Sequence, residues 1–425
     1  MAAYPQLSHN AAFRRLWWGQ TAGFLGFQVA TLVTSTTAIS VLQASNAEIG
    51  VVNAAQLAAF LFLGLPAGAW VDRWRKKPTM VVANVARTLA LAWIPVAWLV
   101  GVLDVLQLII VSALVGVSSV FFDVASQSLI PRLVAVDQIS AANGRLEASF
   151  QVTRIAGPGI AGWLMGLVSI PLSFLAASLT YALSAITIAR IPVEEPPSER
   201  PTDGGLFSQI REGIAFVRSE PLLGPLFLSI AWASLTTQGV FVLTPVIALR
   251  ILGVSPSALG TLLAIGALGG IAGAFLHSRV VTRLGVGRTI VWCYTIGSAA
   301  AIGLAIAPYA GDYALAVFIV ANVVMAFFST LYNITQMSLR QSLCPRPLLG
   351  RVNATFRFAV WGAMPVGALL AGWAADYLGI VPTTVLFIAL SLTAGVAMAL
   401  TPAARLRTVP LPHQVESAQE LECAP

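Results

Sequence analysis

The stretch GAWVDRWRKKP, from Gly68 to Pro78, separates two apolar segments and holds four basic residues and one acid. The apolar segment before it begins near Ile49, and the one after it ends near Val100. Each is long enough to cross a bilayer, which takes about 20 apolar residues in a helix. Lysine and arginine beside an apolar helix mark the cytoplasmic side of the membrane. The stretch therefore predicts a short cytoplasmic loop between two membrane-spanning helices.

The composition extends this prediction to the whole chain. Of its 425 residues, 57% are hydrophobic and 10% are charged, and the mean hydropathy is +0.84. A typical soluble domain has about a quarter of its residues charged. Lipid solvates the apolar side chains that a soluble fold could not bury, so we expect an all-α membrane protein. The net charge of +7 lies in short runs between apolar segments, which indicates topology signals and contacts with membrane lipids rather than nucleic-acid binding.

Apolar runs predict twelve membrane-spanning helices in two sets of six. The first set covers Leu16–Val41, Ile49–Val71, Thr79–Val100, Val105–Gln127, Ala142–Leu167 and Pro171–Ile191. The second set covers Leu222–Leu249, Ser257–Leu276, Thr289–Pro308, Tyr313–Gln336, Phe356–Ala375 and Val381–Leu400.

The segments between and after the two sets complete the expected domain organisation. We expect a six-helix bundle over residues 1–191 and a second one over residues 222–402. Residues 192–221 form a cytoplasmic linker, rich in proline and charge at its start, with an amphipathic surface helix from Leu206 to Glu220. Residues 403–425 are polar and predict a disordered cytoplasmic tail.

The positions of the basic residues predict the orientation. With the N-terminus inside, all but three of the 24 lysines and arginines fall on the cytoplasmic side. Arg87 and Arg154 lie within helices, and Arg250 lies outside. The positive-inside rule therefore predicts that both termini lie in the cytoplasm. We expect the protein to be a multi-pass protein of the cell membrane.

The two halves of the chain share a repeat at an offset of 206 residues. Phe121-Phe122 recurs as Phe327-Phe328, and Gly144-Arg145 recurs as Gly350-Arg351. Ala148-Ser149-Phe150 is matched by Ala354-Thr355-Phe356 at the same offset. Because each half has six helices, the two copies have the same orientation in the membrane. Parallel repeats about an axis along the membrane normal are typical of transporters, and we expect two pseudo-symmetric six-helix bundles.

The stretch from Gly68 to Pro78 also resembles a known sequence signature. Its residues are similar to the loop signature of the major facilitator superfamily, G-x-x-x-D-R-x-x-R-K, with Gly68, Asp72, Arg73 and Arg75 at the matching or neighbouring positions. The resemblance implies the fold of that superfamily and a cytoplasmic gate latched by the acid and the arginines. The alternative is that the basic cluster serves only as a topology anchor. The corresponding second-half stretch has His277 near the position of the acid, so a second latch is in doubt.

Other stretches resemble exporters within this superfamily. GPGIAG, from Gly157 to Gly162, is similar to their G-P-x-x-G-G element, and Gly157, Pro158 and Gly162 would permit a kink and close helix packing. Ordinary small-residue packing is the alternative. REGIAFVRSEPLL, PRLVAVDQISAANG and LCPRPLLGRVNATF resemble the branch that contains the enterobactin exporter and macrolide efflux proteins.

Charged residues inside the predicted helices are candidates for proton coupling, because an ionised side chain in the bilayer is costly. Asp123 in the fourth helix is the leading proton carrier, with Arg87, Glu147 and Arg154 as companions. A desolvated carboxyl group can exchange a proton. The alternative is that Asp123 and Glu147 lie at the interface and pair with arginines.

The resemblance further implies that the first, fourth, seventh and tenth helices line a central substrate cavity. Their polar and aromatic residues suit an amphipathic ligand, although polar residues also join helices. The candidates are Gln28, Thr31, Ser35, Ser119, Trp232, Thr236, Gln238, Asn322, Met325 and Phe328.

Together these features predict a secondary transporter that exports an amphipathic small molecule, such as a drug or a siderophore, in exchange for protons. An uptake transporter or a lipid flippase on the same fold is the alternative, and a membrane receptor is the alternative outside transport. The sequence has no nucleotide loop, nucleophile motif or metal-ligand spacing, so we expect no enzyme activity, no cofactor and no metal. We expect a monomer.

Overall fold

The computed structural model describes residues 7, 9–64, 66–193, 215, 217–220, 222–343 and 349–408. This part of the chain is built of helices and has no strand. Eleven helical segments in it are long and apolar enough to cross a membrane. α6, Ile139–Leu167, is the twelfth long segment, with 29 residues, but glycine and polar side chains make it less apolar. The prediction of an all-α protein with twelve membrane-spanning helices is confirmed.

The chain divides into two compact units. Unit 1 comprises residues 1–206 and 248–264, and unit 2 comprises residues 207–247 and 265–425. Most of the expected linker and of the amphipathic helix Leu206–Glu220 lies outside the described residues, apart from a helical segment at residues 217–219. The predicted domain boundaries stay a prediction.

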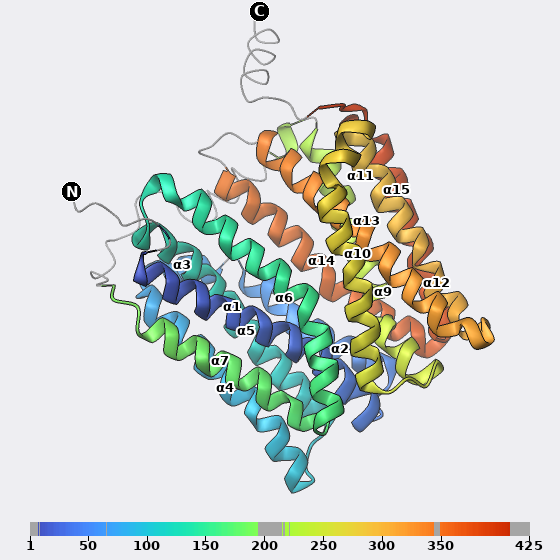
Figure 1. The fold of residues 1–425 in the computed structure, drawn as a ribbon, viewed down its shortest axis with the longest axis horizontal. Coiled ribbons are helices and arrows are strands. Elements are labelled where there is room, and N and C mark those ends of the chain that lie inside the picture. The colour runs from blue at the N-terminus through green and yellow to red at the C-terminus, as the bar shows by residue number, and fades with distance from the viewer. Residues whose placement is uncertain are drawn as a thin grey trace, which may run out of the picture. The chain divides into compact units, whose positions relative to one another are not determined.

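Unit 1 is a bundle in which α1 packs on α6 and α7, and α4 packs on α5 and α7 (Figure 1). α2 and α3 pack on α5. Besides α6, its helices are α1 Ala11–Thr36, α2 Asn46–Leu63, α3 Pro66–Arg73, α4 Lys76–Val100, α5 Val105–Leu133 and α7 Phe174–Ala189. One cluster of buried apolar side chains in this unit includes Phe13, Leu16, Met80, Phe122 and Leu129.

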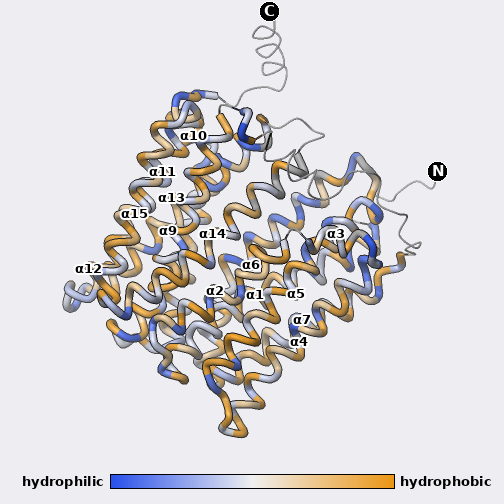
Figure 2. The backbone as a smooth tube through the Cα atoms, turned by 180° about the vertical axis from the view of Figure 1, so that it is seen from behind, coloured by the Kyte–Doolittle hydropathy of each residue, from blue (hydrophilic) through white to orange (hydrophobic). Residues whose placement is uncertain are grey.

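Unit 2 repeats this plan, with α9 packed on α14 and α15 and with α11 packed on α13 and α15. Its helices are α9 Leu223–Val246, the second part of α10 Pro256–Leu284, α11 Val286–Ala300, α12 Ile302–Ile306, α13 Ala314–Leu343, α14 Leu349–Leu378 and α15 Ile380–Leu400. Figure 2 shows hydrophobic residues along the length of the helices, with hydrophilic residues gathered toward their ends.

The repeat predicted from the sequence falls on corresponding helices. Phe121 and Phe327 lie on α5 and α13, and the two copies of the Gly-Arg motif lie on α6 and α14. The first helix of each half also ends in the same way. A π-helical turn follows α1 at Thr37–Val41 and follows α9 at Ile247–Ile251, 210 residues later.

Several helix boundaries differ from those predicted. The second helix was expected to be continuous over Ile49–Val71, but it is broken between α2 and α3, where Pro66 can donate no backbone hydrogen bond. α5 and α10 run six and eight residues further than expected, to Leu133 and Leu284. Their C-terminal ends carry polar residues, which hydropathy excludes from a span although the backbone remains helical.

The beginning of the expected tail is ordered. Pro402–Arg405 form a 3₁₀ turn, and the carbonyl groups of Leu406 and Arg407 accept hydrogen bonds from the backbone N–H groups of Gly287 and Val286, at 2.8 and 3.2 Å. Those N–H groups belong to the first turn of α11 and have no acceptor within the helix. The segment after the last membrane helix therefore caps α11.

Candidate functional site

The stretch from Gly68 to Pro78 is anchored to α5 by aromatic contacts. Trp70 and Trp74 both stack on Phe121, with ring centroids 6.1 and 5.6 Å apart. Lys76 is buried, and its ammonium group donates to the carbonyl oxygens of Val71 and Trp74 at 2.6 and 2.9 Å. One of the four basic residues thus closes the turn between α3 and α4, while aromatic rings fix α3 on the bundle.

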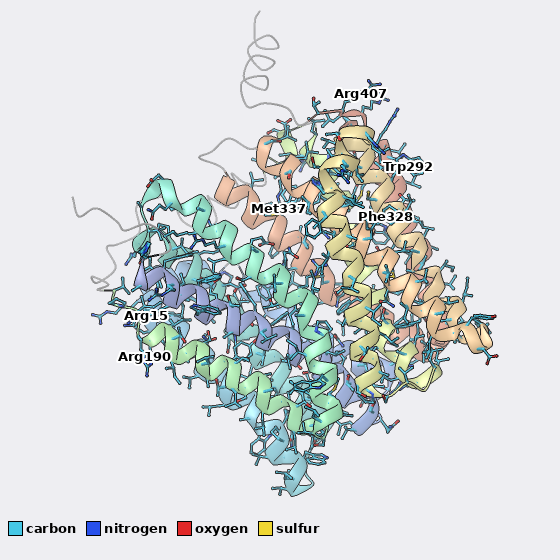
Figure 3. The ribbon with its side chains drawn as sticks, viewed as in Figure 1. Arg15, Arg190, Trp292, Phe328, Met337 and Arg407 are labelled. Carbon is cyan, nitrogen blue, oxygen red and sulfur yellow. The ribbon has the colours of Figure 1, made fainter. Side chains whose placement is uncertain are left out.

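The predicted gate residues lie on this anchored segment. Gly68, Asp72 and Arg73 belong to α3, and Arg75 is the residue immediately before α4. Arg73 and Arg75 are exposed, and Gly68 is half-buried. The side chain of Asp72 lies outside the described residues. At the same end of unit 1, Arg15 donates to the carbonyl oxygen of Arg190, which joins the ends of α1 and α7 (Figure 3).

A cluster of polar and aromatic side chains surrounds Arg87 inside unit 1. Its guanidinium carbon lies 4.8 Å from the ring centroid of Phe122 and 5.0 Å from that of Tyr181. Asn84 accepts a hydrogen bond from Arg87 at 3.2 Å and donates to the hydroxyl of Ser184 at 2.8 Å. Arg87 is 4% exposed, and its Nε has no hydrogen-bond partner in the described part of the chain. Two cation–π contacts, each worth about 2 kcal/mol when desolvated, offset part of the cost of burying this charge.

Asp123 supplies the negative charge of the same cluster. It follows Phe122 on α5, is half-buried, and interacts electrostatically with both Arg87 and Tyr181. The structure therefore brings together two of the four predicted proton-coupling residues, Asp123 and Arg87.

The other two proton-coupling candidates form a pair of their own on α6. Glu147 is exposed, accepts a hydrogen bond from Gln151 at 2.7 Å, and interacts electrostatically with Arg154.

Gly157 and Gly162 of the GPGIAG element lie where other helices approach α6 closely. A Cβ atom added to Gly157 would lie 2.4 Å from Cβ of Gln28 on α1. A Cβ atom added to Gly162 would lie 2.4 Å from Cα of Gly260, in the part of α10 that belongs to unit 1. Pro158 lies inside α6, which continues through it. The two glycines thus allow α1 and the first part of α10 to approach α6 more closely than helices usually approach one another.

Comparisons with known proteins identify the family of this helical architecture. The profile described as Major Facilitator Superfamily matches residues 16–364. The chain belongs to the Major Facilitator Superfamily. The fold, the resemblance to this superfamily and the resemblance to its efflux branch are confirmed, and the protein is a multi-pass membrane transporter rather than an enzyme.

Two relatives carry the resemblance to the efflux branch. The chain is 28% identical over 367 residues to the multidrug efflux pump Tap of Mycobacterium tuberculosis, covering 82% of this chain and 83% of Tap. It is 25% identical over 319 residues to the enterobactin exporter EntS of Salmonella typhimurium, covering 73% of each. A solved structure of an auto-inhibited POT family peptide transporter has a TM-score of 0.72 at 13% identity, covering 93% of this chain and 96% of that one, and so shares the fold.

The four candidate cavity residues of the first half differ from one another in burial and in hydrogen bonding. Gln28 and Thr31 are half-buried on α1, while Ser35 and Ser119 are buried. Thr31 donates to the carbonyl of Phe27 and accepts from Gln56 at 3.2 Å. The hydroxyl of Ser119 donates to its own helix at 2.7 Å. Of these four side chains, Ser35 and Ser119 are the least accessible to a ligand.

The cavity candidates of the second half divide in the same way. Thr236 and Gln238 are buried on α9, whereas Asn322, Met325 and Phe328 on α13 are half-buried. The Phe328 ring packs edge-on against Phe327 at 5.1 Å. Trp232 is 39% exposed and donates from its indole N–H to Thr393 on α15 at 2.9 Å. It therefore joins two helices of unit 2.

Asn84, Tyr181 and Ser184 were not predicted from the sequence as members of the Arg87 cluster. Asn84 lies three residues before Arg87, a spacing that places both on one face of a helix and that could have suggested the pair. Tyr181 and Ser184 come from α7, about a hundred residues later. Nothing in the local sequence of α7 indicates that these two side chains face α4.

Proposed function

We propose that this protein is an exporter that exchanges an amphipathic small molecule for protons by alternating access. It acts as a monomer in the cell membrane, with both termini and the linker at residues 192–221 in the cytoplasm. Export is supported by the names of Tap and EntS, an efflux pump and an exporter. Proton coupling rests on one observation, the placement of Asp123 and Arg87 in a single cluster inside a membrane bundle.

The cluster suggests how a proton would change the conformation. Protonation of Asp123 would remove its negative charge and with it the electrostatic attraction between Asp123 and Arg87. Arg87 would keep its contacts with Phe122 and Tyr181, and Asp123 would be free to change its surroundings. Protonated and ionised forms then prefer different arrangements of α4, α5 and α7, which is the requirement for coupling.

Three successive residues of α5 would transmit this change to the cytoplasmic gate. The ring of Phe121 stacks on Trp70 and Trp74. The ring of Phe122 lies under the guanidinium group of Arg87, and Asp123 supplies the carboxylate that interacts with Arg87. We therefore propose that protonation at Asp123 loosens the latch formed by Asp72, Arg73 and Arg75. In the second half, Ser329 stands at the position of Asp123, and a hydroxyl group does not titrate near neutral pH.

The candidates on α1, α5, α9 and α13 would line the substrate path. Gln28, Asn322, Met325 and Phe328 are accessible enough to contact a ligand directly. Their mixture of amide, thioether and aromatic groups fits an amphipathic molecule better than a strongly polar one.

Inverted membrane vesicles with an acidic lumen provide the test. Accumulation of cationic, neutral and anionic amphipathic dyes should depend on the gradient in the wild type and should be lost in Asp123→Asn, with dye binding retained. Asp104→Asn is the matched control, because Asp104 caps the N-terminal end of the same helix and asparagine caps a helix equally well. Accumulation by Asp123→Asn would exclude Asp123 as the carrier. Release of dye from wild-type vesicles on acidification would favour uptake instead.

A further inference from the structure

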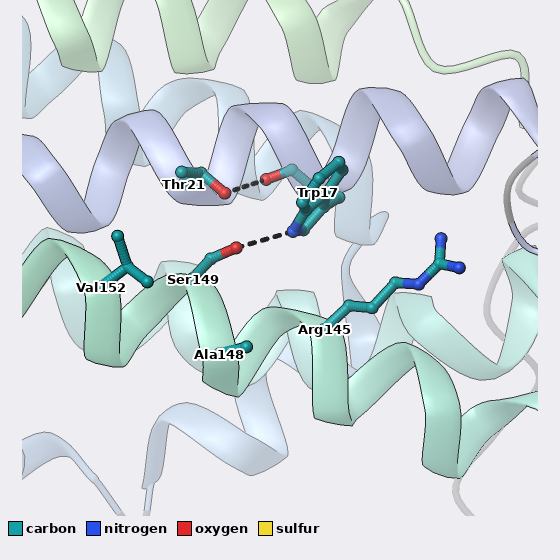
Figure 4. A pocket seen from close by; sticks show the side chains of 6 residues that line it. All are labelled: Trp17, Thr21, Arg145, Ala148, Ser149 and Val152. Carbon is teal, nitrogen blue, oxygen red and sulfur yellow. Dashed lines mark hydrogen bonds between the residues drawn. The ribbon is translucent and has the colours of Figure 1, made fainter. Parts of the chain in front are cut away.

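A pocket lies between α1 and α6 in unit 1, apart from the Arg87 cluster and the gate. It has a volume of about 350 Å³ and is lined by Trp17, Thr21, Arg145, Ala148, Ser149 and Val152 (Figure 4). Ligand pockets usually have about 300–1,000 Å³, so this one has room for a ring or a short alkyl segment. Three of the lining residues, Arg145, Ala148 and Ser149, belong to the repeated motifs and are not used by the proposed mechanism.

Most polar groups of the pocket are already paired. The indole N–H of Trp17 donates to the hydroxyl of Ser149 at 2.7 Å, and the hydroxyl of Thr21 donates to the carbonyl of Trp17 at 2.8 Å. The remaining polar group is the exposed guanidinium of Arg145, which reaches away from α6 beside Trp17 (Figure 4). Val152 is 64% exposed and leaves an apolar wall uncovered. The pocket thus combines an apolar surface with one positive charge at its edge.

At the corresponding place in the second half, aromatic side chains pack on one another. With the offset of 210 residues that relates α1 to α9, Phe227 occupies the position of Trp17. Phe227 packs edge-on against Phe356 at 5.0 Å, and Arg340 covers the same ring at 4.8 Å. In the first half Phe150, the counterpart of Phe356, pairs instead with Phe24 at 5.2 Å. The pseudo-symmetry therefore breaks at this pocket, where Trp17 makes a hydrogen bond to Ser149 and its counterpart Phe227 makes an aromatic contact.

We propose that this pocket is a subsite for anionic amphiphiles. The anionic group binds Arg145, and the apolar part lies along Trp17, Ala148 and Val152. A guanidinium group matches the geometry of carboxylate, sulfate and phosphate oxygens. Arg14 and Arg15 at the start of α1 add positive charge at the same end of the bundle, which attracts anions further. The inference rests on the proposed export of amphipathic molecules, and it narrows their class to anions.

Equilibrium binding tests this assignment without a proton gradient. The probes are 11-(dansylamino)undecanoic acid and its uncharged methyl ester, with energy transfer from tryptophan measured in nanodiscs of phosphatidylcholine. The wild type should bind the acid about tenfold more tightly than the ester, as expected for one charge-assisted hydrogen bond. Arg145→Gln should lose this preference. Arg132→Gln, an exposed arginine in the last turn of α5, should keep it.

A second variant separates the pocket from the charge alone. Val152→Trp fills the apolar part and should weaken binding of both acid and ester. Nanodiscs that contain phosphatidylglycerol distinguish two sources of the anion: competition with the acid identifies a membrane lipid as the occupant, and its absence identifies a cytoplasmic solute. Equal binding of acid and ester by the wild type, or an unchanged preference in Arg145→Gln, would overturn the proposal. Neither result depends on the transport assay, so failure here and failure of proton coupling are distinguishable.

Discussion

Replacement of Gly157 by alanine should separate the packing of α6 on α1 from the helix propensity of α6 itself. The added Cβ atom would lie 2.4 Å from Cβ of Gln28, and ordinary contact between two carbon atoms is about 3.5–4.0 Å. Cβ of Gln28 is fixed to the backbone, so α1 and α6 must move apart by about 1 Å. Overpacking of this kind costs about 1–3 kcal/mol.

Gly144→Ala is the matched control on the same helix. Nothing lies within 4 Å of a Cβ atom added to Gly144. Both variants gain about 1 kcal/mol from the higher helix propensity of alanine, so their difference isolates the steric term of about 1–3 kcal/mol. Gly157→Ala should therefore be the less stable of the two.

Two measurements on the purified protein check the reasoning. The midpoint of thermal unfolding in detergent should be lower for Gly157→Ala than for Gly144→Ala. Transport should fall only in Gly157→Ala, since the displaced Gln28 is a candidate ligand contact. Equal unfolding midpoints in the two variants would refute the close approach of α1 and α6 at Gly157.

Three further outcomes concern other parts of the molecule. Arg250 donates to Asn46 at 2.8 Å and to a neighbouring carbonyl, so Arg250→Gln should speed amide hydrogen exchange at residues 43–49 about tenfold; unchanged exchange would exclude this role. In a cysteine-free background, cysteine at Val102 should react with an impermeant thiol reagent from outside the cell, and cysteine at Asp137 should not; the reverse pattern would invert the proposed topology. Burial raises the pKa of Glu220, against a smaller opposite effect of a backbone hydrogen bond. The folded state therefore holds this proton more tightly than the unfolded state, and the stability it contributes is lost as the pH rises through the folded-state pKa. The midpoint temperature of thermal unfolding should fall less steeply from about pH 4 to pH 8 in Glu220→Gln than in the wild type. Equal slopes of midpoint temperature against pH in the two proteins would contradict this.

The class of protein and the order of its helices could be predicted from the amino-acid sequence. Twelve apolar segments, a repeat at constant offset and the loop at Gly68–Pro78 suffice for a transporter of two six-helix halves. These features can be recognised in the sequence because each depends on residues that are close together along the chain, or on the cost of placing charge in lipid. The exact ends of the helices were less legible, since polar residues continue α5 and α10 beyond the apolar spans.

Contacts between side chains of different helices could be read from the folded structure alone. Phe121, Phe122 and Asp123 follow one another on α5, but the first contacts the loop after α3 and the second contacts Arg87 on α4. The pocket beside Arg145 likewise depends on how α1 and α6 are rotated about their axes. In a membrane bundle every face of a helix can be apolar, so hydrophobic periodicity does not specify which face meets a neighbour. Close packing between helices supplies that information, and it exists only when the whole bundle is assembled.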